Sequence, residues 1–197
     1  MKKINFIILI LFITFFLGSC KDKDTLEWTN EECVEAYVRL EDRERIYDIE
    51  SCWNSPEWTW IRFVEDTSIW CGEFRGKYIG ATFSEMKGII IVVTSDYIFI
   101  VDITTKEIID SERNFEYCDV TCTPLGDVLF SSGYGLEILR DRTISSVETI
   151  ILPINTDSLR FVEYKDNILE MNCYEFCNWS NNVTLFLDCE TMIVTKS

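Results

Sequence analysis

The 197-residue sequence contains no histidine. Histidine is the commonest general acid or base and the commonest metal ligand near neutral pH. Its absence excludes Ser-His-Asp and Cys-His catalysis and every His-ligated zinc site. Carboxylate chemistry remains open to an enzyme, but with 34 Asp and Glu residues no catalytic pair can be chosen by spacing. We therefore expect a non-catalytic protein without a cofactor or a bound metal.

Basic residues are scarce. The chain has 18 Lys and Arg residues against 34 acidic residues, so its formal net charge is −16. Nucleic acid and anionic lipid head groups attract proteins through a positive field, so neither is an expected partner. The negative charge favours solubility and suits a basic partner.

The longest apolar run lies at the N-terminus, where only Thr14 interrupts the apolar residues from Phe6 to Leu17. A basic start precedes this run and small residues follow it, which is the layout of a secretory signal. A membrane-spanning helix needs about 20 apolar residues, and this run is shorter and is followed by charged residues. We predict that residues 1–19 are a signal peptide.

The end of this leader, Leu17-Gly18-Ser19-Cys20, resembles the lipobox of bacterial lipoproteins. The resemblance implies that Cys20 is diacylated and becomes the first residue after cleavage, which anchors the protein to the bacterial outer membrane. The alternative is an ordinary cleaved signal with an unmodified cysteine. The charged residues 21–24 resemble a surface-export signal of some lipoproteins, or they are part of a solvated tether.

Cleavage would leave 178 residues (197 − 19), enough for one domain with a core. We predict a flexible acidic tether over residues 20–30 and a single all-β domain over residues 31–197. Since the leader holds two lysines and no acid, cleavage would make the formal charge −18 (16 − 34).

Nine cysteines are present, and eight remain if Cys20 carries lipid. An even number in an exported chain favours up to four disulfides. The disulfide candidates are Cys33, Cys52, Cys71, Cys118, Cys122, Cys173, Cys177 and Cys189. Two C-x₃-C pairs could instead supply four thiolates to a metal, but zinc knuckles usually have tighter C-x₂-C spacing, so we do not predict a metal site. Along an extended strand the two members of such a pair would lie about 13 Å apart, so each pair spans a turn or bonds elsewhere.

The second half of the chain repeats a pattern of strand, turn, strand, Asp-led turn and strand. Its three units begin at Gly88, Gly126 and Asn167, which are 38 (126 − 88) and 41 (167 − 126) residues apart. This period loosely resembles β-propeller-type repeats, and it predicts an all-β antiparallel meander with repeats near 88–125, 126–166 and 167–197. N-terminal strands would supply a first unit, enough for at most a four-bladed closure. A β-sandwich is the alternative.

Two segments of the first repeat are continuously apolar, Ile89 to Val93 and Ile98 to Val101. Such runs are typical of strands that are packed on both faces.

The segment from Asn30 to Glu50 has two interpretations. Acidic residues after Asn30 indicate the start of a short helix. The alternating Val34, Ala36, Val38 and Leu40, with a charged turn and a return from Arg45, favour a hairpin instead, and we prefer the hairpin.

Tryptophan is concentrated near the N-terminus, where five of the six residues lie between positions 28 and 70. Trp53 and Trp58 flank a turn at Asn54-Ser55-Pro56 and are candidate ligand-binding residues. The alternative is that Trp58, Trp60 and Trp70 fill the core.

A third ligand-binding candidate, Trp179, lies in a segment from Asn172 to Asn182 that interrupts the third repeat. We predict a loop that is braced by Cys173 and Cys177 and projects to bind a partner. A loop that folds back over an edge strand is equally consistent with the pattern.

Together these features predict a cell-envelope lipoprotein that is attached to the membrane by its lipid and acts as a non-catalytic interaction module for protein or glycan. One alternative is a carboxylate-dependent glycan hydrolase that uses acids near the tryptophans, such as Glu57 or Glu65. Another is an immunity-type lipoprotein that neutralises a toxin.

Overall fold

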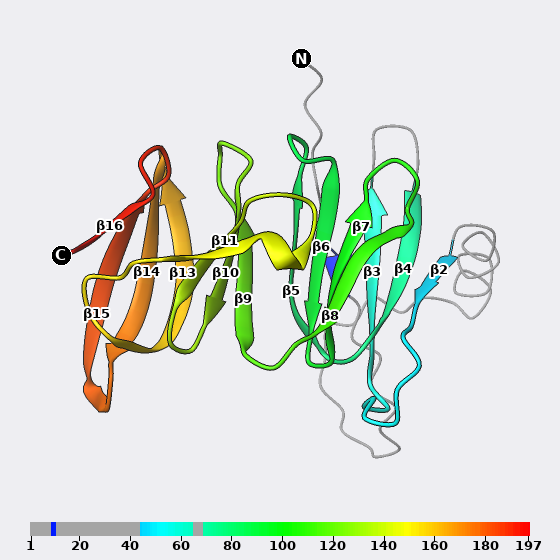
Figure 1. The fold of residues 1–197 in the computed structure, drawn as a ribbon, viewed down its shortest axis with the longest axis horizontal. Helices are drawn as coiled ribbons and strands as arrows, with labels where there is room; N and C mark the ends of the chain where they lie inside the picture. The colour runs from blue at the N-terminus through cyan, green and yellow to red at the C-terminus, as the bar shows by residue number, and fades with distance from the viewer. Residues whose placement is uncertain (1–8, 11–43, 65–68) are drawn as a thin grey trace, which may run out of the picture.

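The computed structural model describes residues 9–10, 44–64 and 69–197. These residues form four four-stranded sheets, which we call A to D and which follow one another along the molecule (Figure 1). Sheet A contains β1 (Leu9–Ile10), β2 (Glu44–Tyr47), β3 (Trp58–Val64) and β4 (Ile69–Arg75). Sheet B contains β5 (Tyr78–Ser84), β6 (Ile89–Thr94), β7 (Tyr97–Asp102) and β8 (Ile108–Arg113). Sheet C contains β9 (Tyr117–Cys122), β10 (Val128–Ser132), β11 (Leu136–Leu139) and β12 (Val147–Ile150). Sheet D contains β13 (Thr156–Lys165), β14 (Ile168–Glu175), β15 (Asn178–Asp188) and β16 (Ile193–Lys196).

Sheets B, C and D are antiparallel meanders in which each strand pairs with the next one in sequence. The predicted all-β class and the propeller-like repeat are therefore confirmed, and the two-sheet sandwich is not the architecture. A single 3₁₀ turn, Ile144–Ser146, is the helical element of the described residues. None of the described helical segments is long and apolar enough to cross a membrane.

The repeat has the predicted length but a different start. The first strands of sheets B, C and D begin at Tyr78, Tyr117 and Thr156, 39 residues apart in each case (117 − 78 and 156 − 117). The predicted starts, near 88, 126 and 167, instead fall at the second strand of each sheet. The second strands are the more apolar ones, because β6 and β10 are buried throughout whereas β5 and β9 are only half-buried.

Sheet A differs from the other three because its strand order is β1-β3-β4-β2. Its edge strand β2 pairs with β4 in the parallel sense, with Tyr47 opposite Phe74. Arg45, on the returning arm of the predicted hairpin, lies in strand β2. The other arm of that hairpin lies outside the described residues. Strand β1 pairs with β3 and belongs to the predicted leader, so that cleavage after Ser19 would leave three strands in this sheet.

The sheets stack face to face, and three apolar clusters fill the spaces between A and B, between B and C, and between C and D. Side chains alternate along a strand, so the two central sheets supply a cluster on each face. In β6, Ile90 and Val92 pack toward sheet A, while Ile89 and Ile91 pack toward sheet C. This arrangement explains the continuous apolar runs and confirms that both strands are buried on both faces.

The stack is open within the described residues, since no apolar cluster joins sheet D to sheet A and the two lie at opposite ends (Figure 1). The outer face of sheet D is largely polar. In β14, Glu170 and Asn172 alternate with buried Leu169 and Met171, and Thr184 donates a hydrogen bond to Asn172 Oδ1 at 3.1 Å. A polar outer face is what the last unit of a repeat stack needs in water.

Carboxylates also link neighbouring sheets. Asp119 of β9 accepts a hydrogen bond from the backbone N–H of Phe161 in β13 at 3.1 Å, and burial raises the pKa of Asp119 despite this bond. Asp102 at the end of β7 accepts backbone bonds from the turn that follows it and pairs with Arg142 of the turn before β12. The backbone N–H of Thr105, then Arg142, lower the pKa of Asp102 to about 2, so that this carboxylate is charged at neutral pH.

The cysteines differ from the predicted disulfide framework. Cys52, Cys118, Cys122, Cys173, Cys177 and Cys189 are free thiols. Cys118 and Cys122 lie on the single strand β9, too far apart to bridge, and Cys173 is buried in β14 whereas Cys177 is exposed in the following turn. Cys20 and Cys33 lie outside the described residues.

We expect the apolar side chains packed between sheets A and B to contribute much of the free energy of folding. Phe99 is fully buried there, with its ring centroid 5.4 Å from that of Phe74. Replacing it, Phe99→Ala, should lower the free energy of unfolding by about 3 to 5 kcal/mol in a denaturant titration. The matched control is Phe115→Ala, whose side chain is 85% exposed, and its effect should stay within about 0.5 kcal/mol. Equal effects of the two variants would contradict this packing.

Candidate functional site

The strands of sheets B, C and D run alternately in opposite directions, so that successive turns lie alternately at the two ends of the sheets. One end carries the turns 95–96, 114–116, 133–135, 151–155 and 176–177. The segment 48–57 lies at the same end, because the backbone N–H of Ser55 donates to Asp96 Oδ2 at 2.7 Å. We call this end, at the bottom of Figure 1, the loop face.

The loop face carries a set of exposed aromatic side chains. They are Trp53 (76% exposed), Phe115 (85%), Tyr134 (69%), Phe176 (51%) and Trp179 (66%). The turns at the opposite end expose Met86 and Leu125 but no aromatic side chain among the described residues. Exposed aromatic side chains gathered on one face of a soluble domain are typical of an interaction surface.

Trp53 is positioned by polar contacts that attach its segment to sheet B. Arg113, at the end of β8, donates to the backbone oxygen of Trp53 at 3.2 Å and to Ser51 Oγ at 3.3 Å. The Tyr97 hydroxyl donates to Asn54 Oδ1 at 2.6 Å. These bonds leave the indole of Trp53 in solvent, so the structure supports this candidate as an exposed side chain.

Asp96 anchors the same segment and is buried. Burial would raise the pKa of its carboxyl, but hydrogen bonds from Ser95 and Ser55 outweigh burial and lower that pKa. The carboxylate is therefore charged when it holds the segment.

Trp58 does not join this surface. It lies half-buried in β3, and the Arg75 guanidinium lies 3.6 Å from its ring centroid. Arg75 is in turn held by two hydrogen bonds to the carboxylate of Asp48, at 2.9 and 2.7 Å. The guanidinium covers one side of the Trp58 ring, and Trp70 is buried in the core.

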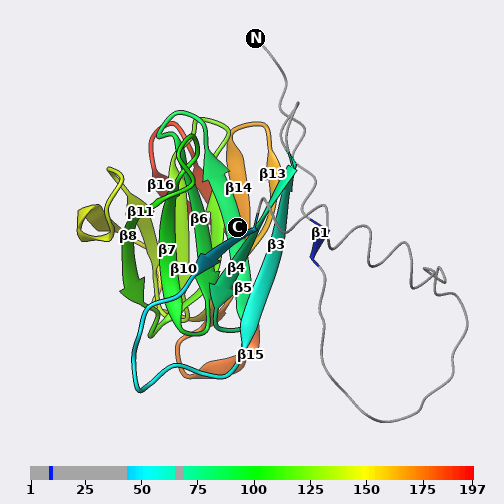
Figure 2. The same cartoon turned by 90° about the vertical axis from the view of Figure 1, so that its right-hand side faces the viewer.

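Trp179 lies on a hairpin rather than on the predicted loop. Strand β14 continues to Glu175, and β15 begins at Asn178, so most of the segment from Asn172 to Asn182 is regular strand. The turn is fixed from outside, since the backbone N–H of Phe176 donates to Asn155 at 3.0 Å and that of Cys177 donates to the buried Asp157 at 2.8 Å. The hairpin projects at the loop face, as Figure 2 also shows.

Three aromatic residues of the loop face, Phe115, Tyr134 and Phe176, were not among the candidates from sequence. Each lies in a short turn between two strands, where small and polar residues are usual. A bulky aromatic residue in such a turn is the sequence feature that could have identified them as candidates. Their proximity to the other aromatic residues depends on the alternation of the turns, which the sequence alone does not display.

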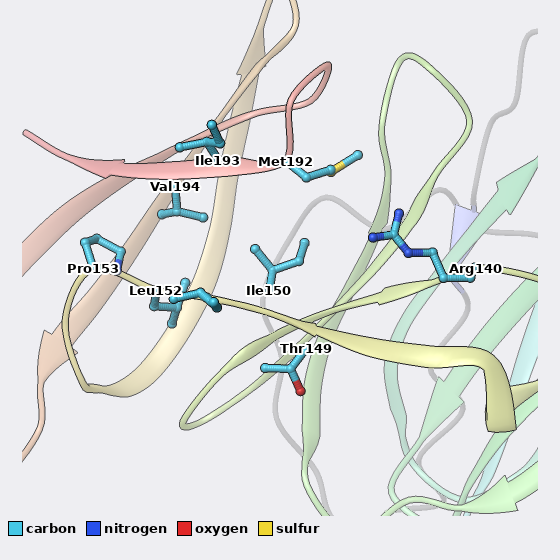
Figure 3. Close-up of a pocket in the computed structure, with 9 residues that line it drawn as sticks. Arg140, Thr149, Ile150, Leu152, Pro153, Met192, Ile193 and Val194 are labelled. Carbon is cyan, nitrogen blue, oxygen red and sulfur yellow. The ribbon is translucent and has the colours of Figure 1, made fainter.

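An apolar groove of about 430 Å³ runs between the outer edges of sheets C and D (Figure 3). Its walls are β12 with the loop that follows it, and the start of β16. The lining residues are Arg140, Thr149, Ile150, Ile151, Leu152, Pro153, Met192, Ile193 and Val194. The lining has no carboxylate, and its single cation, Arg140, is paired with Glu148 at 2.7 Å. Such a groove suits apolar contact.

No group of three or more potential metal ligands occurs within residues 9–10, 44–64 and 69–197. Burial raises the pKa of the Cys122 thiol to about 11, so that it is not a thiolate at neutral pH. Of the acids considered for glycan hydrolysis, Glu57 is exposed beside the tryptophan segment and Glu65 lies outside the described residues.

No known protein family and no curated protein matches the chain. Among solved structures, it is similar to the N-terminal domain of Nup159, with 13% identity and a TM-score of 0.44 over 62% of this chain and 34% of that one. It is also similar to a chain in a Saccharomyces cerevisiae complex of Dbp5 with Nup159, Gle1, IP6 and ADP. That match has 12% identity and a TM-score of 0.42, over 79% of this chain and 43% of the other. The chain thus spans less than half of the length of either match.

We expect Arg113 to hold Trp53 in place. Arg113→Ala removes two hydrogen bonds of about 1 kcal/mol each, and amide hydrogen exchange across residues 50–56 should accelerate by roughly tenfold or more. The control is Arg140→Ala, whose side chain is paired with Glu148 on sheet C and does not contact this segment. Unchanged exchange in the Arg113 variant would show that other contacts position the segment.

Proposed function

We propose that the protein is a bacterial envelope lipoprotein whose β domain binds a protein partner through its loop face. The observation that carries this proposal is the gathering of five exposed aromatic side chains, contributed by segments next to all four sheets, at one end of the stack. Aromatic residues are enriched at the centres of protein interfaces, because they bury a large area at a low cost in side-chain entropy. A glycan is the other ligand class that such side chains suit.

The anchor is proposed from the leader. Cys20 would carry the lipid, and residues 20–30 would link it to the domain, which begins in the described residues with Glu44 of β2. We place the protein at the outer membrane, where the acidic domain needs no direct contact with anionic lipid.

Lipid attachment predicts the behaviour of a Cys20→Ser variant. Incorporation of labelled palmitate should disappear, and the protein should move from the membrane fraction to the soluble fraction, because at least two acyl chains are needed for stable attachment. Cys52→Ser provides the control, since Cys52 is a free, exposed thiol whose loss should change neither result. Retention of label by the Cys20 variant would refute the anchor.

If the loop face binds a protein partner, photocrosslinking in intact cells should occur from that face and not from the opposite end of the sheets. A photoreactive residue in place of Trp53, Phe115 or Tyr134 should give crosslinks to a protein, whereas the same residue at Met86 or Leu125 should not. The second pair is also exposed but lies at the opposite end of the sheets, which makes it a matched control. Crosslinks only from Met86 and Leu125, or equally from both sets, would contradict the proposal.

A further inference from the structure

The part of the loop face next to sheets C and D holds four aromatic residues in two pairs. The ring centroids of Tyr134 and Phe176 are 6.5 Å apart, and those of Tyr174 and Trp179 are 5.5 Å apart. Three of these residues lie on the β14–β15 hairpin and the fourth on the β10–β11 turn. We call the four residues the hairpin aromatic cluster.

Elsewhere in the described residues, four aromatic rings have a cation from the same chain beside them. Arg75 lies 3.6 Å from the ring centroid of Trp58, and Lys106 lies 5.0 Å from that of Trp70. Arg113 lies 5.7 Å from the ring centroid of Tyr97 and 5.9 Å from that of Phe115. Within the described residues, no cation lies over any ring of the hairpin aromatic cluster. These rings therefore have faces that an external cation can use.

The charge around the cluster is negative. The segments 133–135, 151–155 and 174–182 contain no Lys or Arg, and they contain one acid, Glu175. Asn181 and Asn178 donate to Glu175 Oε2 at 2.8 and 3.3 Å, and these bonds, in that order, lower the pKa of this carboxyl, which is therefore charged at neutral pH. Lys196 is the one cation of the described residues that lowers the pKa of Glu175, and it lowers this pKa less than either asparagine does.

Glu175 and three of the four aromatic residues lie on the β14–β15 hairpin. Glu175 is opposite Asn178 in the β14–β15 ladder, one residue before Phe176, and Trp179 follows Asn178. A cation that binds this hairpin through both kinds of group needs a planar face for an aromatic ring and N–H groups for the carboxylate. Arginine meets both requirements, whereas the lysine ammonium is a compact point charge without a planar face.

We propose that the hairpin aromatic cluster binds an arginine side chain of a basic partner, with the guanidinium stacked on an exposed ring and paired with Glu175. This inference rests on the proposed function of the loop face and names the chemistry of its partner. The net charge of −16 would bring such a partner to the surface and accelerate association.

The test is the binding of synthetic 12-residue peptides to the purified full domain, measured by calorimetry. The three peptides alternate Gly with Arg, with Lys or with Glu. The Arg peptide should bind more tightly than the Lys peptide, and the Glu peptide should not bind. Trp179→Ala should raise the Kd of the Arg peptide by about 3- to 30-fold. Glu175→Gln should also weaken binding and should reduce its dependence on salt.

Met86→Ala is the control, because Met86 is a large side chain of similar exposure, 73% against 66% for Trp179, but lies at the opposite end of the sheets. It should leave the Kd of the Arg peptide within about twofold. Circular dichroism should show that all variants are folded, as expected for changes at exposed side chains. Binding that is insensitive to Trp179→Ala, or equally sensitive to Met86→Ala, would overturn the proposal in favour of general attraction to an acidic surface.

A tetrasaccharide of N-acetylglucosamine tests the glycan alternative in the same assay. Binding of this sugar that is lost in Trp179→Ala, together with no binding of the Arg peptide, would assign the cluster to glycan and overturn the arginine proposal. Crosslinks from Trp53, Phe115 and Tyr134 in cells are a separate result. Their presence without Arg-peptide binding would reject only the arginine proposal, and their absence would reject the proposed function itself.

Discussion

The structure depends on the packing of apolar sheet faces against one another. Sheets B and C are covered on both faces, so most positions of their central strands are apolar, and β6 is buried throughout. Burial of apolar surface is the main favourable contribution to folding, at roughly 25 cal/mol per Å². The two end sheets have one outer face each, and the polar outer face of sheet D ends the stack in water.

This packing fixes the strands and leaves the turns free to vary. Because the strands alternate in direction, every second turn lies at the loop face, and residues far apart in sequence become neighbours on one surface. Carboxylates support this arrangement where the sheets meet. Asp96 holds the segment of Trp53 to sheet B, and Asp119 holds β13 of sheet D to β9 of sheet C. The exposed aromatic residues contribute little to these contacts, which is consistent with a role in binding rather than in folding.

The sequence was sufficient to predict the parts that depend on local pattern. The apolar runs at Ile89 and Ile98 correctly predicted strands buried on both faces, and the period near 40 correctly predicted the repeated sheets. The start of each repeat was misplaced by one strand, because half-buried strands such as β5 have a weak apolar pattern. The number of cysteines could not show that they are free thiols, because disulfide pairing depends on the distances between cysteines on different strands. Of the three candidate tryptophans, Trp53 and Trp179 are exposed on the loop face, whereas Trp58 lies half-buried beneath Arg75, a contact that depends on the pairing of β3 with β4.

The central claim is that the loop face, and not the opposite end of the stack, is covered by a partner in the cell envelope. Hydroxyl-radical footprinting tests it most directly, by comparing the oxidation of each exposed side chain in envelope-attached and purified protein. We predict that Trp53, Phe115, Tyr134 and Trp179 are protected together in the envelope while Met86 is oxidised at the same rate in both samples. Protection of Met86 with no protection of the four aromatic residues would contradict the claim.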